Sequence, residues 1–151
     1  MTQIEIICKE HLCAVAEIEE LCFSEPWSEE SLQLLTREGG AGFVALVDGK
    51  VAAYGGMLCV LDEGQITNIA THPDFRRRGL ARAVVGALAK YARENGITSI
   101  FLEVRESNAA ARSLYKQCGF EEIGSRKRFY RAPVEDAVLM RLKEEKCIFS
   151  E

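Results

Sequence analysis

The sequence predicts an α/β domain with a mixed sheet of about seven strands and helices on both faces of the sheet. In the middle of the chain, short apolar runs alternate with longer segments whose apolar residues recur every three to four positions, as strands and helices do. Nearer the ends, strand-like runs follow one another directly, which indicates antiparallel hairpins. The 151 residues, 48% of them hydrophobic, suit one domain with a sizeable core.

The N-terminal part is predicted to hold a strand and two helices. Residues 4–8 form a short apolar run, and residues 10–22 place apolar side chains at helical spacing. Ser28 is a good N-cap for a second helix, because two glutamates follow it, and that helix is expected to end near Gly39-Gly40. Trp27 lies in the loop between the helices, where it either packs the helix entry onto the core or forms one wall of a substrate groove.

A hairpin and a third strand come next. Residues 42–47 and 50–60 are predicted strands, and Asp48-Gly49 between them is a strong signal for a tight hairpin turn. Residues 61–64 form a further turn that leads into a strand over 65–71.

The second half alternates helices and strands before it ends in a hairpin. The helix that starts at Leu80 is expected to stop at Asn95-Gly96, and Asn108 is expected to cap a later helix that closes with Gly119. The remaining predicted elements are strands over 97–104, 120–130 and 134–142, followed by a polar tail over 143–151.

A basic, glycine-containing loop lies between the strand at 65–71 and the helix at Leu80. His72-Pro73-Asp74 ends the strand, and Arg76-Arg77-Arg78-Gly79-Leu80-Ala81 follows. A helix N-terminus presents unpaired N–H groups and a positive dipole end, which suits a phosphate or pyrophosphate. Gly79 and Ala81 keep the approach of such a ligand free of large side chains.

Charge and cysteine usage narrow the possible functions. The net charge of −4 gives no support to direct nucleic-acid binding, and the positive charge gathers at the proposed anion site. Six cysteines without C-x-x-C spacing and only two histidines predict no metal site. With no secretory signal at the N-terminus and no apolar run long enough to span a bilayer, we expect a cytoplasmic protein without a membrane partner.

Arg76-x-x-Gly79-x-Ala81 resembles the acetyl-coenzyme A (acetyl-CoA) loop of the GNAT superfamily of N-acetyltransferases, whose pattern is Arg/Gln-x-x-Gly-x-Gly/Ala. Residues 102–111 (LEVRESNAAA) and 114–120 (LYKQCGF) are similar to one branch, the bacterial ribosomal-protein-alanine N-acetyltransferases. Residues 23–28 (FSEPWS) and Glu135-Asp136-Ala137 fit the same branch, so the resemblance covers almost the whole chain as one GNAT domain.

The resemblance implies a reaction and a set of site residues. Acetyl-CoA would lie between two splayed central strands and donate its acetyl group to the N-terminal alanine of a small-subunit ribosomal protein, without a metal. Glu103 would be the general base and Tyr115 the general acid. The cofactor-binding residues would be Ile69, Ala70 and Thr71 for the pantetheine arm, Arg77, Arg78, Gly79, Leu80, Ala81 and Arg82 for the pyrophosphate, and Asn108.

Each catalytic assignment has an alternative. Glu103 interrupts an apolar strand near its carboxyl end, where ligands of α/β sheets tend to bind, but it would also suit a strand end turned to water. Tyr115 lies two helical turns past Asn108, where it either donates a proton or only packs against the sheet and orients the thioester.

Two departures from the branch pattern leave the acceptor open. The loop over 131–134 is shorter than usual, and Phe129-Tyr130 stands where two tyrosines are common. An acetyltransferase of a small-molecule amine, or of a broader set of protein N-termini, therefore remains an alternative. A non-catalytic acyl-CoA-binding module is a third possibility, which the presence of both Glu103 and Tyr115 disfavours.

Overall fold

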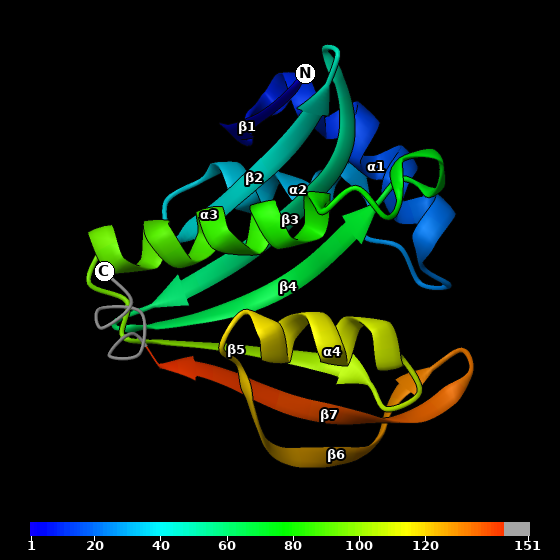
Figure 1. The fold of residues 1–151 in the computed structure, drawn as a ribbon, viewed down its shortest axis with the longest axis vertical. Coiled ribbons are helices and arrows are strands. Elements are labelled where there is room, and N and C mark those ends of the chain that lie inside the picture. Colours follow the sequence, from blue (N-terminus) through cyan, green and yellow to red (C-terminus); the bar gives the residue numbers. More distant parts are fainter. Residues whose placement is uncertain (144–151) are drawn as a thin grey trace.

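A seven-stranded mixed sheet runs through residues 1–143, which are the residues that the computed structural model describes. The strand order is β1-β2-β3-β4-β5-β7-β6, and every neighbouring pair is antiparallel except β4 and β5 (Figure 1). The strands are β1 (Thr2–Ile6), β2 (Gly40–Val47), β3 (Lys50–Val60), β4 (Glu63–Thr71), β5 (Ser99–Arg105), β6 (Glu121–Arg131) and β7 (Val134–Lys143).

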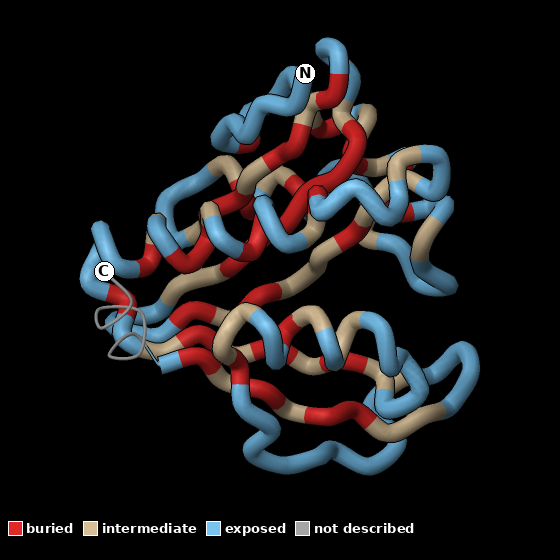
Figure 2. Tube along the Cα trace, in the orientation of Figure 1, coloured by how far each residue is buried: buried red, intermediate tan, exposed pale blue. Residues whose placement is uncertain are grey.

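Helices cover both faces of the sheet, as predicted. On one face, α1 (Leu12–Cys22) and α2 (Glu29–Leu32) pack into an apolar cluster with β2, β3 and β4. On the other, α3 (Leu80–Glu94) and α4 (Ala109–Gln117) contribute to a second cluster, and both lie in front of the sheet in Figure 1. Burial is greatest along the central strands, whereas nearly all of β6 is exposed (Figure 2).

The sheet opens between β4 and β5. These parallel strands pair only where Glu63–Gln65 meet Ser99–Phe101, and beyond that point they diverge (Figure 1). On its other side, β4 pairs with β3 through a bulge at Thr67, because Gly56 pairs with Asn68 and Met57 with Ile66. A bulge bends its strand and increases the local twist. The carboxyl-terminal halves of β4 and β5 therefore form the two sides of an opening, which agrees with the predicted splay.

Several local signals act as predicted. Asp48 and Gly49 both adopt positive φ, at 50° and 83°, as a tight hairpin turn requires. Ser28 Oγ accepts a hydrogen bond from the Ser31 N–H at 3.1 Å, which caps α2.

The second helix differs most from its prediction. It was expected to run to Gly39-Gly40, but α2 ends at Leu32 and a 3₁₀ helix follows over Gln33–Thr36. Residues three apart lie on the same side of a 3₁₀ helix, so Leu32 and Leu35 are both buried while Leu34 is 43% exposed. The tighter helix therefore gives the better fit to this leucine spacing.

Other boundaries also differ from the predictions. The first strand ends at Ile6 rather than at residue 8, because the Cys8 N–H donates to His11 Nδ1 at 3.1 Å and starts a turn over Lys9–His11. That turn delays α1 to Leu12. The fifth strand begins at Ser99 because the Ile97 N–H still bonds the Ala92 carbonyl of α3 at 2.9 Å. Lys143, expected in the polar tail, is the last residue of β7, and the rest of the tail, 144–151, lies outside the described residues.

Candidate active site

The basic loop after β4 forms one wall of a shallow cavity. Gly79 is the N-cap of α3 at φ +75°, with no side-chain cap on the first turn of the helix, so the helix presents its N–H groups to this cavity. A non-glycine residue would be strained at that φ. The cavity measures about 210 Å³, and its lining includes the predicted residues Thr71, Arg77, Gly79, Leu80, Ala81 and Arg82.

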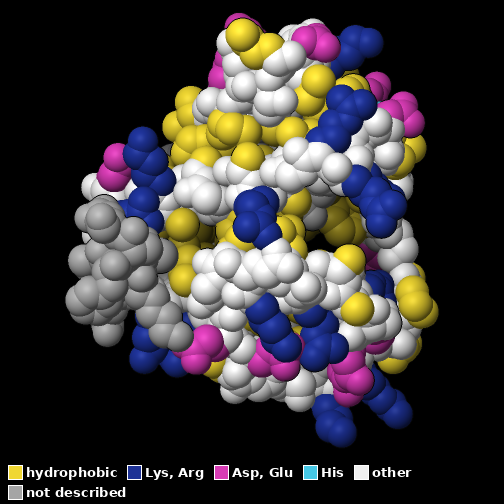
Figure 3. All heavy atoms as spheres, viewed as in Figure 1, with side chains coloured by type: hydrophobic (Ala, Val, Ile, Leu, Met, Phe, Trp, Pro, Cys, Tyr) yellow, Lys and Arg dark blue, Asp and Glu magenta, His cyan; other side chains and the backbone are white. Residues whose placement is uncertain are grey.

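Arg78 is the member of the predicted loop that does not line this cavity. Its guanidinium carbon lies 5.2 Å from the centre of the Phe75 ring, in a cation–π contact. In Figure 3 the surface is hollowed between α3 and α4, and Lys and Arg side chains lie beside the hollow. The loop therefore offers backbone N–H groups and positive charge at one end of the opening between β4 and β5.

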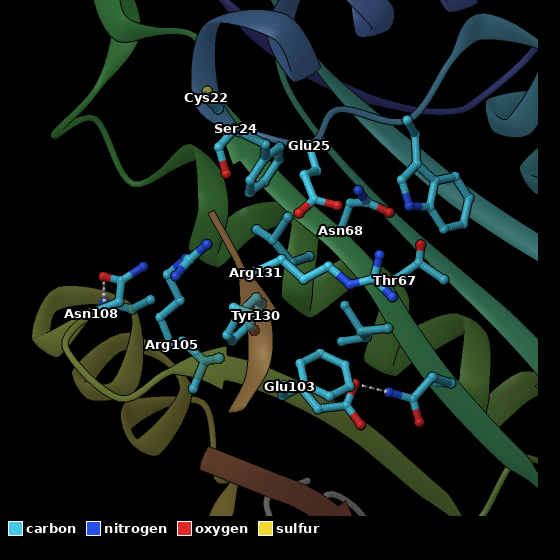
Figure 4. Close-up of a pocket in the computed structure, with 18 of the residues that line it drawn as sticks. Cys22, Ser24, Glu25, Thr67, Asn68, Glu103, Arg105, Asn108, Tyr130 and Arg131 are labelled. Carbon is cyan, nitrogen blue, oxygen red and sulfur yellow. Dashed lines mark hydrogen bonds between the residues drawn. The ribbon is translucent and has the colours of Figure 1, made fainter. Parts of the chain in front are cut away.

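A larger cavity of about 610 Å³ lies further along the same opening (Figure 4). Four segments that are distant in the sequence line it: the loop between α1 and α2, the bulged part of β4, the end of β5 with α4, and the end of β6. Both predicted catalytic residues, Glu103 and Tyr115, are among the lining residues.

Glu103 extends from β5 into this cavity with 16% of its side chain exposed. Gln65 of β4 donates a hydrogen bond from Nε2 to Glu103 Oε1 at 2.8 Å, drawn as a dashed line in Figure 4. Arg126 Nε of β6 lies 3.9 Å from the other carboxylate oxygen. The carboxylate is therefore held across the opening and can accept a proton from a group in the cavity, rather than facing bulk water.

Tyr115 lies on α4 and is only 8% exposed. Its ring packs against Phe120, with 5.9 Å between the ring centres. Burial, with smaller contributions from Tyr130 and Cys118, raises the pKa of Tyr115 above its ordinary value. A raised pKa keeps the hydroxyl protonated, which is the state that a proton donor needs. The packing interpretation and the acid interpretation of this tyrosine are thus compatible.

Tyr130, at the end of β6, brings a second phenol to the same cavity. Burial raises the pKa of Tyr130 to about 12, helped by Glu103 and Glu135 and opposed by the Arg105 guanidinium. Glu103 is thus close enough to Tyr130 to affect its ionisation. In the sequence, Tyr130 belongs to a departure from the branch pattern that leaves the acceptor open. In the structure it lies on the wall of the cavity that holds both predicted catalytic residues.

Two of the three predicted pantetheine-binding residues line a cavity. Ile69 lines the larger cavity and Thr71 the smaller one, whereas Ala70 faces the opposite side of β4 and is buried against the α1 cluster. Asn108 lines the larger cavity and also caps α4, because its Oδ1 accepts from the Ala111 N–H at 3.2 Å. Its two predicted roles are therefore compatible in position.

A buried carboxylate behind the larger cavity was missed at the sequence level. Glu19 of α1 is fully buried and accepts hydrogen bonds from the Trp27 N–H at 2.7 Å, from Asn68 Nδ2 at 2.9 Å and from the Tyr54 hydroxyl. Burial raises its pKa, against the opposing effect of these donors. Glu19 follows Val15 by four positions, so its place on the buried helix face could have been read from the spacing.

Glu19 ties together two walls of the larger cavity. Trp27 and Asn68 both line that cavity, on the α1–α2 loop and on β4 respectively. Trp27 also packs against the apolar cluster of α1 and α2, which confirms its predicted packing role. Its place on the cavity wall is compatible with the prediction that it borders a substrate groove. Among residues 1–143, no three His, Cys, Asp or Glu side chains gather as ligands of a metal would, and no helix is long and apolar enough to cross a membrane.

Comparisons with known proteins agree with this geometry. The model of the acetyltransferase (GNAT) family matches residues 12–120. A [ribosomal protein bS18]-alanine N-acetyltransferase of Escherichia coli K12 is 38% identical over 133 residues, covering 87% of this chain and 90% of that protein. A Bacillus subtilis protein described as a putative enzyme of the same name is 37% identical over 128 residues, covering 83% and 85%. The crystal structure of the E. coli ribosomal-protein-S18-alanine N-acetyltransferase superposes with a TM-score of 0.88 at 36% identity, covering 95% and 94%.

Proposed function

Because this chain belongs to the GNAT acetyltransferase family and is an N-acetyltransferase, we propose that it transfers the acetyl group of acetyl-CoA to the N-terminal α-amine of a small-subunit ribosomal protein that begins with alanine. The relatives that share more than a third of its residues over most of both chains carry that activity in their names. The observation that supports the proposal most directly is that Glu103 and Tyr115 line one cavity at the opening between β4 and β5.

In the proposed complex, acetyl-CoA lies along the opening and spans both cavities. Its pyrophosphate accepts hydrogen bonds from backbone N–H groups of the residues that line the smaller cavity, Arg77, Gly79, Leu80, Ala81 and Arg82. Its pantetheine arm pairs with the backbone of Ile69, Ala70 and Thr71, as an added strand pairs with a free edge. This edge is free because β5 has already diverged from β4 at these residues. Asn108 contacts the cofactor from the start of α4.

The reaction is a direct transfer within a ternary complex. A peptide α-amine has a pKa of about 7.7–8.0, so a sizeable fraction is protonated at neutral pH and cannot attack. Glu103 accepts the proton, and the amine nitrogen then bonds to the thioester carbonyl carbon. The carbon–sulfur bond breaks, and Tyr115 protonates the departing thiolate of coenzyme A. The nitrogen then loses its second proton, which passes directly or through solvent to the Tyr115 oxygen and restores the phenol. An amide, a free thiol and a protonated Glu103 remain.

The groove for the acceptor lies between the α1–α2 loop and the end of β6. Trp27 on one side and Tyr130 on the other line the cavity together with Glu103. An extended peptide entering between these segments would bring its terminal nitrogen towards the carboxylate. The cytoplasm, where ribosomal proteins are made, is the compartment that this activity requires.

The test is acetylation of defined peptides. The parent enzyme is incubated with acetyl-CoA and a peptide carrying the first residues of a small-subunit ribosomal protein, alanine first, with an internal lysine. A matched peptide with a blocked N-terminus and a polyamine are the controls, and the modified position is assigned by tandem mass spectrometry. The proposal expects one acetyl group on the α-amine of the free peptide. Acetylation of the internal lysine alone, of the polyamine alone, or of nothing would remove it.

A further inference from the structure

The end of β6 borders the larger cavity, and the turn that follows it into β7 is exposed. Nearly all of β6 is exposed, and only Tyr130 near its end is partly buried. The pairing of β6 with β7 is also irregular between Arg126 and Tyr130. Apolar burial therefore does little to fix where Tyr130 and Arg131, which line the cavity, are held.

Arg105 supplies several of the contacts that hold this turn, beside the backbone pairing of Tyr130 with Glu135 and of Arg131 with Val134. Its Nη1 donates to the Pro133 carbonyl at 2.9 Å and to Glu135 Oε1 at 3.1 Å, and its Nη2 donates to the Ala132 carbonyl at 3.3 Å. Its guanidinium carbon also lies 4.4 Å from the centre of the Tyr130 ring. One side chain thus contacts the backbone, the carboxylate and the aromatic ring of the same turn.

The position of Arg105 in the sheet links these contacts to the reaction. It follows Glu103 by two residues on β5, and alternate residues of a strand point to the same side. Both side chains line the larger cavity, and they appear together around it in Figure 4. Arg105 therefore joins the strand that carries the proposed base to the turn that carries the wall of the acceptor groove.

Two further contacts attach the turn to segments outside the β6–β7 hairpin. Glu135 Oε2 accepts the Ser107 N–H at 2.6 Å, which connects the turn to the segment leading into α4. Hydrogen bonding by Ser107, first through its side chain and then through its backbone, lowers the pKa of Glu135. Ser24 Oγ of the α1–α2 loop donates to the Ala132 carbonyl that Arg105 also contacts. The two loops that border the groove thus meet at one carbonyl group.

We propose that Arg105 is a positioning residue that holds Tyr130 and the 131–134 turn in place for the acceptor, and so determines the KM for the acceptor. The inference rests on the proposed function in taking this cavity as the acceptor site. Arginine suits the role because its planar guanidinium donates in several directions while stacking on a ring, which a lysine ammonium cannot do. Holding the turn in one position reduces the ordering that binding an acceptor would otherwise require.

The central experiment compares Arg105→Gln with Arg112→Gln. Arg112 makes a similar attachment elsewhere on β6: it donates to Glu122 at 2.9 and 3.1 Å and to the Glu106 carbonyl at 2.8 Å, without lining either cavity. Arg105→Gln is expected to raise the acceptor KM about tenfold, with kcat and the KM for acetyl-CoA within about twofold of the parent, because only ground-state placement of the acceptor is lost. Arg112→Gln is expected to leave all three constants unchanged.

Arg105→Lys and Glu135→Gln are milder substitutions that should raise the acceptor KM less. They also replace Arg105→Gln in the test if that variant does not fold. Lysine retains the charge but not the several contacts, and Glu135→Gln removes the negative charge that faces the guanidinium while its amide oxygen can still accept. Each variant is therefore expected to raise the acceptor KM about threefold. An unchanged acceptor KM in these variants, or an equal rise in Arg112→Gln, would overturn the inference. A loss confined to kcat would overturn it too, since Arg105 would then act on the reacting groups.

Hydrogen–deuterium exchange separates this inference from the proposed function. Arg105→Gln is expected to speed exchange over residues 127–136 without changing β5, whereas Arg112→Gln leaves residues 127–136 at the parent rate. This measurement needs no acceptor, and the kinetic comparison uses whichever amine the parent acetylates. A parent that acetylates no alanine peptide contradicts the proposed function alone. Parent-like exchange over residues 127–136 in Arg105→Gln contradicts the positioning role alone.

Discussion

The two cavities along the opening of the sheet are built in different ways. The smaller one is lined almost entirely by residues 71–82, so a single continuous stretch of chain makes it. The larger one takes its lining from four segments between Cys22 and Arg131. The first site depends on a glycine and a helix start, which are local features, whereas the second depends on how β5, β6 and β7 are ordered in the sheet.

Because the two cavities are built differently, substitutions in them should have different effects. A change in the loop before α3 alters a surface that, apart from Leu114, one continuous stretch of chain forms, so its effect should be confined to cofactor binding. The larger cavity combines the two proposed catalytic residues with contacts that hold its walls, such as those of Glu19 and Arg105. Variants there should divide into those that lower kcat and those that weaken acceptor binding.

The largest effect is expected from Glu103→Gln. Glutamine can still accept from Gln65 Nε2 through its amide oxygen, so the contact across the opening is preserved while the base is lost. We expect kcat to fall by about 10²-fold or more, with coenzyme A affinity nearly unchanged. The deficit should narrow as pH rises, because more of the amine is then already deprotonated. Turnover close to that of the parent at neutral pH would mean that another group or solvent takes the proton.

Tyr115→Phe is expected to lower kcat by about 10²-fold, near the lower limit for one acid–base group. The ring keeps its packing against Phe120, so folding and coenzyme A affinity should change little. An acetyl donor with a better leaving group than coenzyme A needs less protonation and should recover part of the lost rate. Parent-like turnover of acetyl-CoA by the variant would leave Tyr115 with its packing role only.

Gly79→Val tests the smaller cavity, with Gly96→Val as its matched control. Both glycines have φ near +75°, and a Cβ at either would meet nothing within 4 Å, so both variants suffer similar backbone strain. We expect each to lose about 1–2 kcal/mol of stability. Coenzyme A affinity, measured by calorimetric titration, should drop about tenfold in Gly79→Val only, since the helix start that would hold the pyrophosphate is distorted. Equal affinities in the two folded variants would argue against an anion site at this loop.

The sequence was most informative where structure is determined locally. The Asp48-Gly49 turn, the Asn108 cap and the glycine at the start of α3 each depend on a few adjacent residues, and each is in its predicted place. The end of α2 was missed because the choice between α and 3₁₀ geometry depends on how Leu32 and Leu35 meet the sheet.

The partners of the predicted site residues needed the three-dimensional arrangement. Glu103 and Tyr115 were identified through a resemblance, but the contacts of Gln65 with Glu103 and of Arg105 with the 131–134 turn were not. Residues 38 positions apart meet in the first case, and residues 27 and 28 apart in the second. Periodicity along the chain gives no information on which strands become neighbours, and here β7 lies between β5 and β6.

The smallest effect on turnover is expected from Glu19→Gln, which tests the buried carboxylate behind the larger cavity. Three donors bond to the Glu19 carboxylate, but a glutamine has one oxygen that accepts, and its NH2 group would face the donors that the oxygen does not reach. A loss of about 1–3 kcal/mol of stability is therefore expected at neutral pH. Trp27 and Asn68 should be held less firmly. The acceptor KM should therefore rise modestly, by about twofold to threefold, while kcat and coenzyme A affinity stay near those of the parent.

The pH dependence of this variant is the sharper measurement. Burial raises the pKa of Glu19 in the folded chain above its ordinary value of 4.5, so the folded state takes up a proton at higher pH than the unfolded state does. Between these two pKa values the folded state binds more protons than the unfolded state, so its stability rises as pH falls, and this gain in stability is complete below pH 4.5.

Glutamine cannot titrate, so the stability of the parent minus that of Glu19→Gln should increase from pH 7 downwards. Carboxylates whose pKa is lowered, such as Glu122 and Glu135, are present in both proteins and cancel in the difference. Denaturant unfolding at a series of pH values gives this difference directly, and a difference that is constant or shrinks on acidification would show that Glu19 is not held as a buried carboxylate.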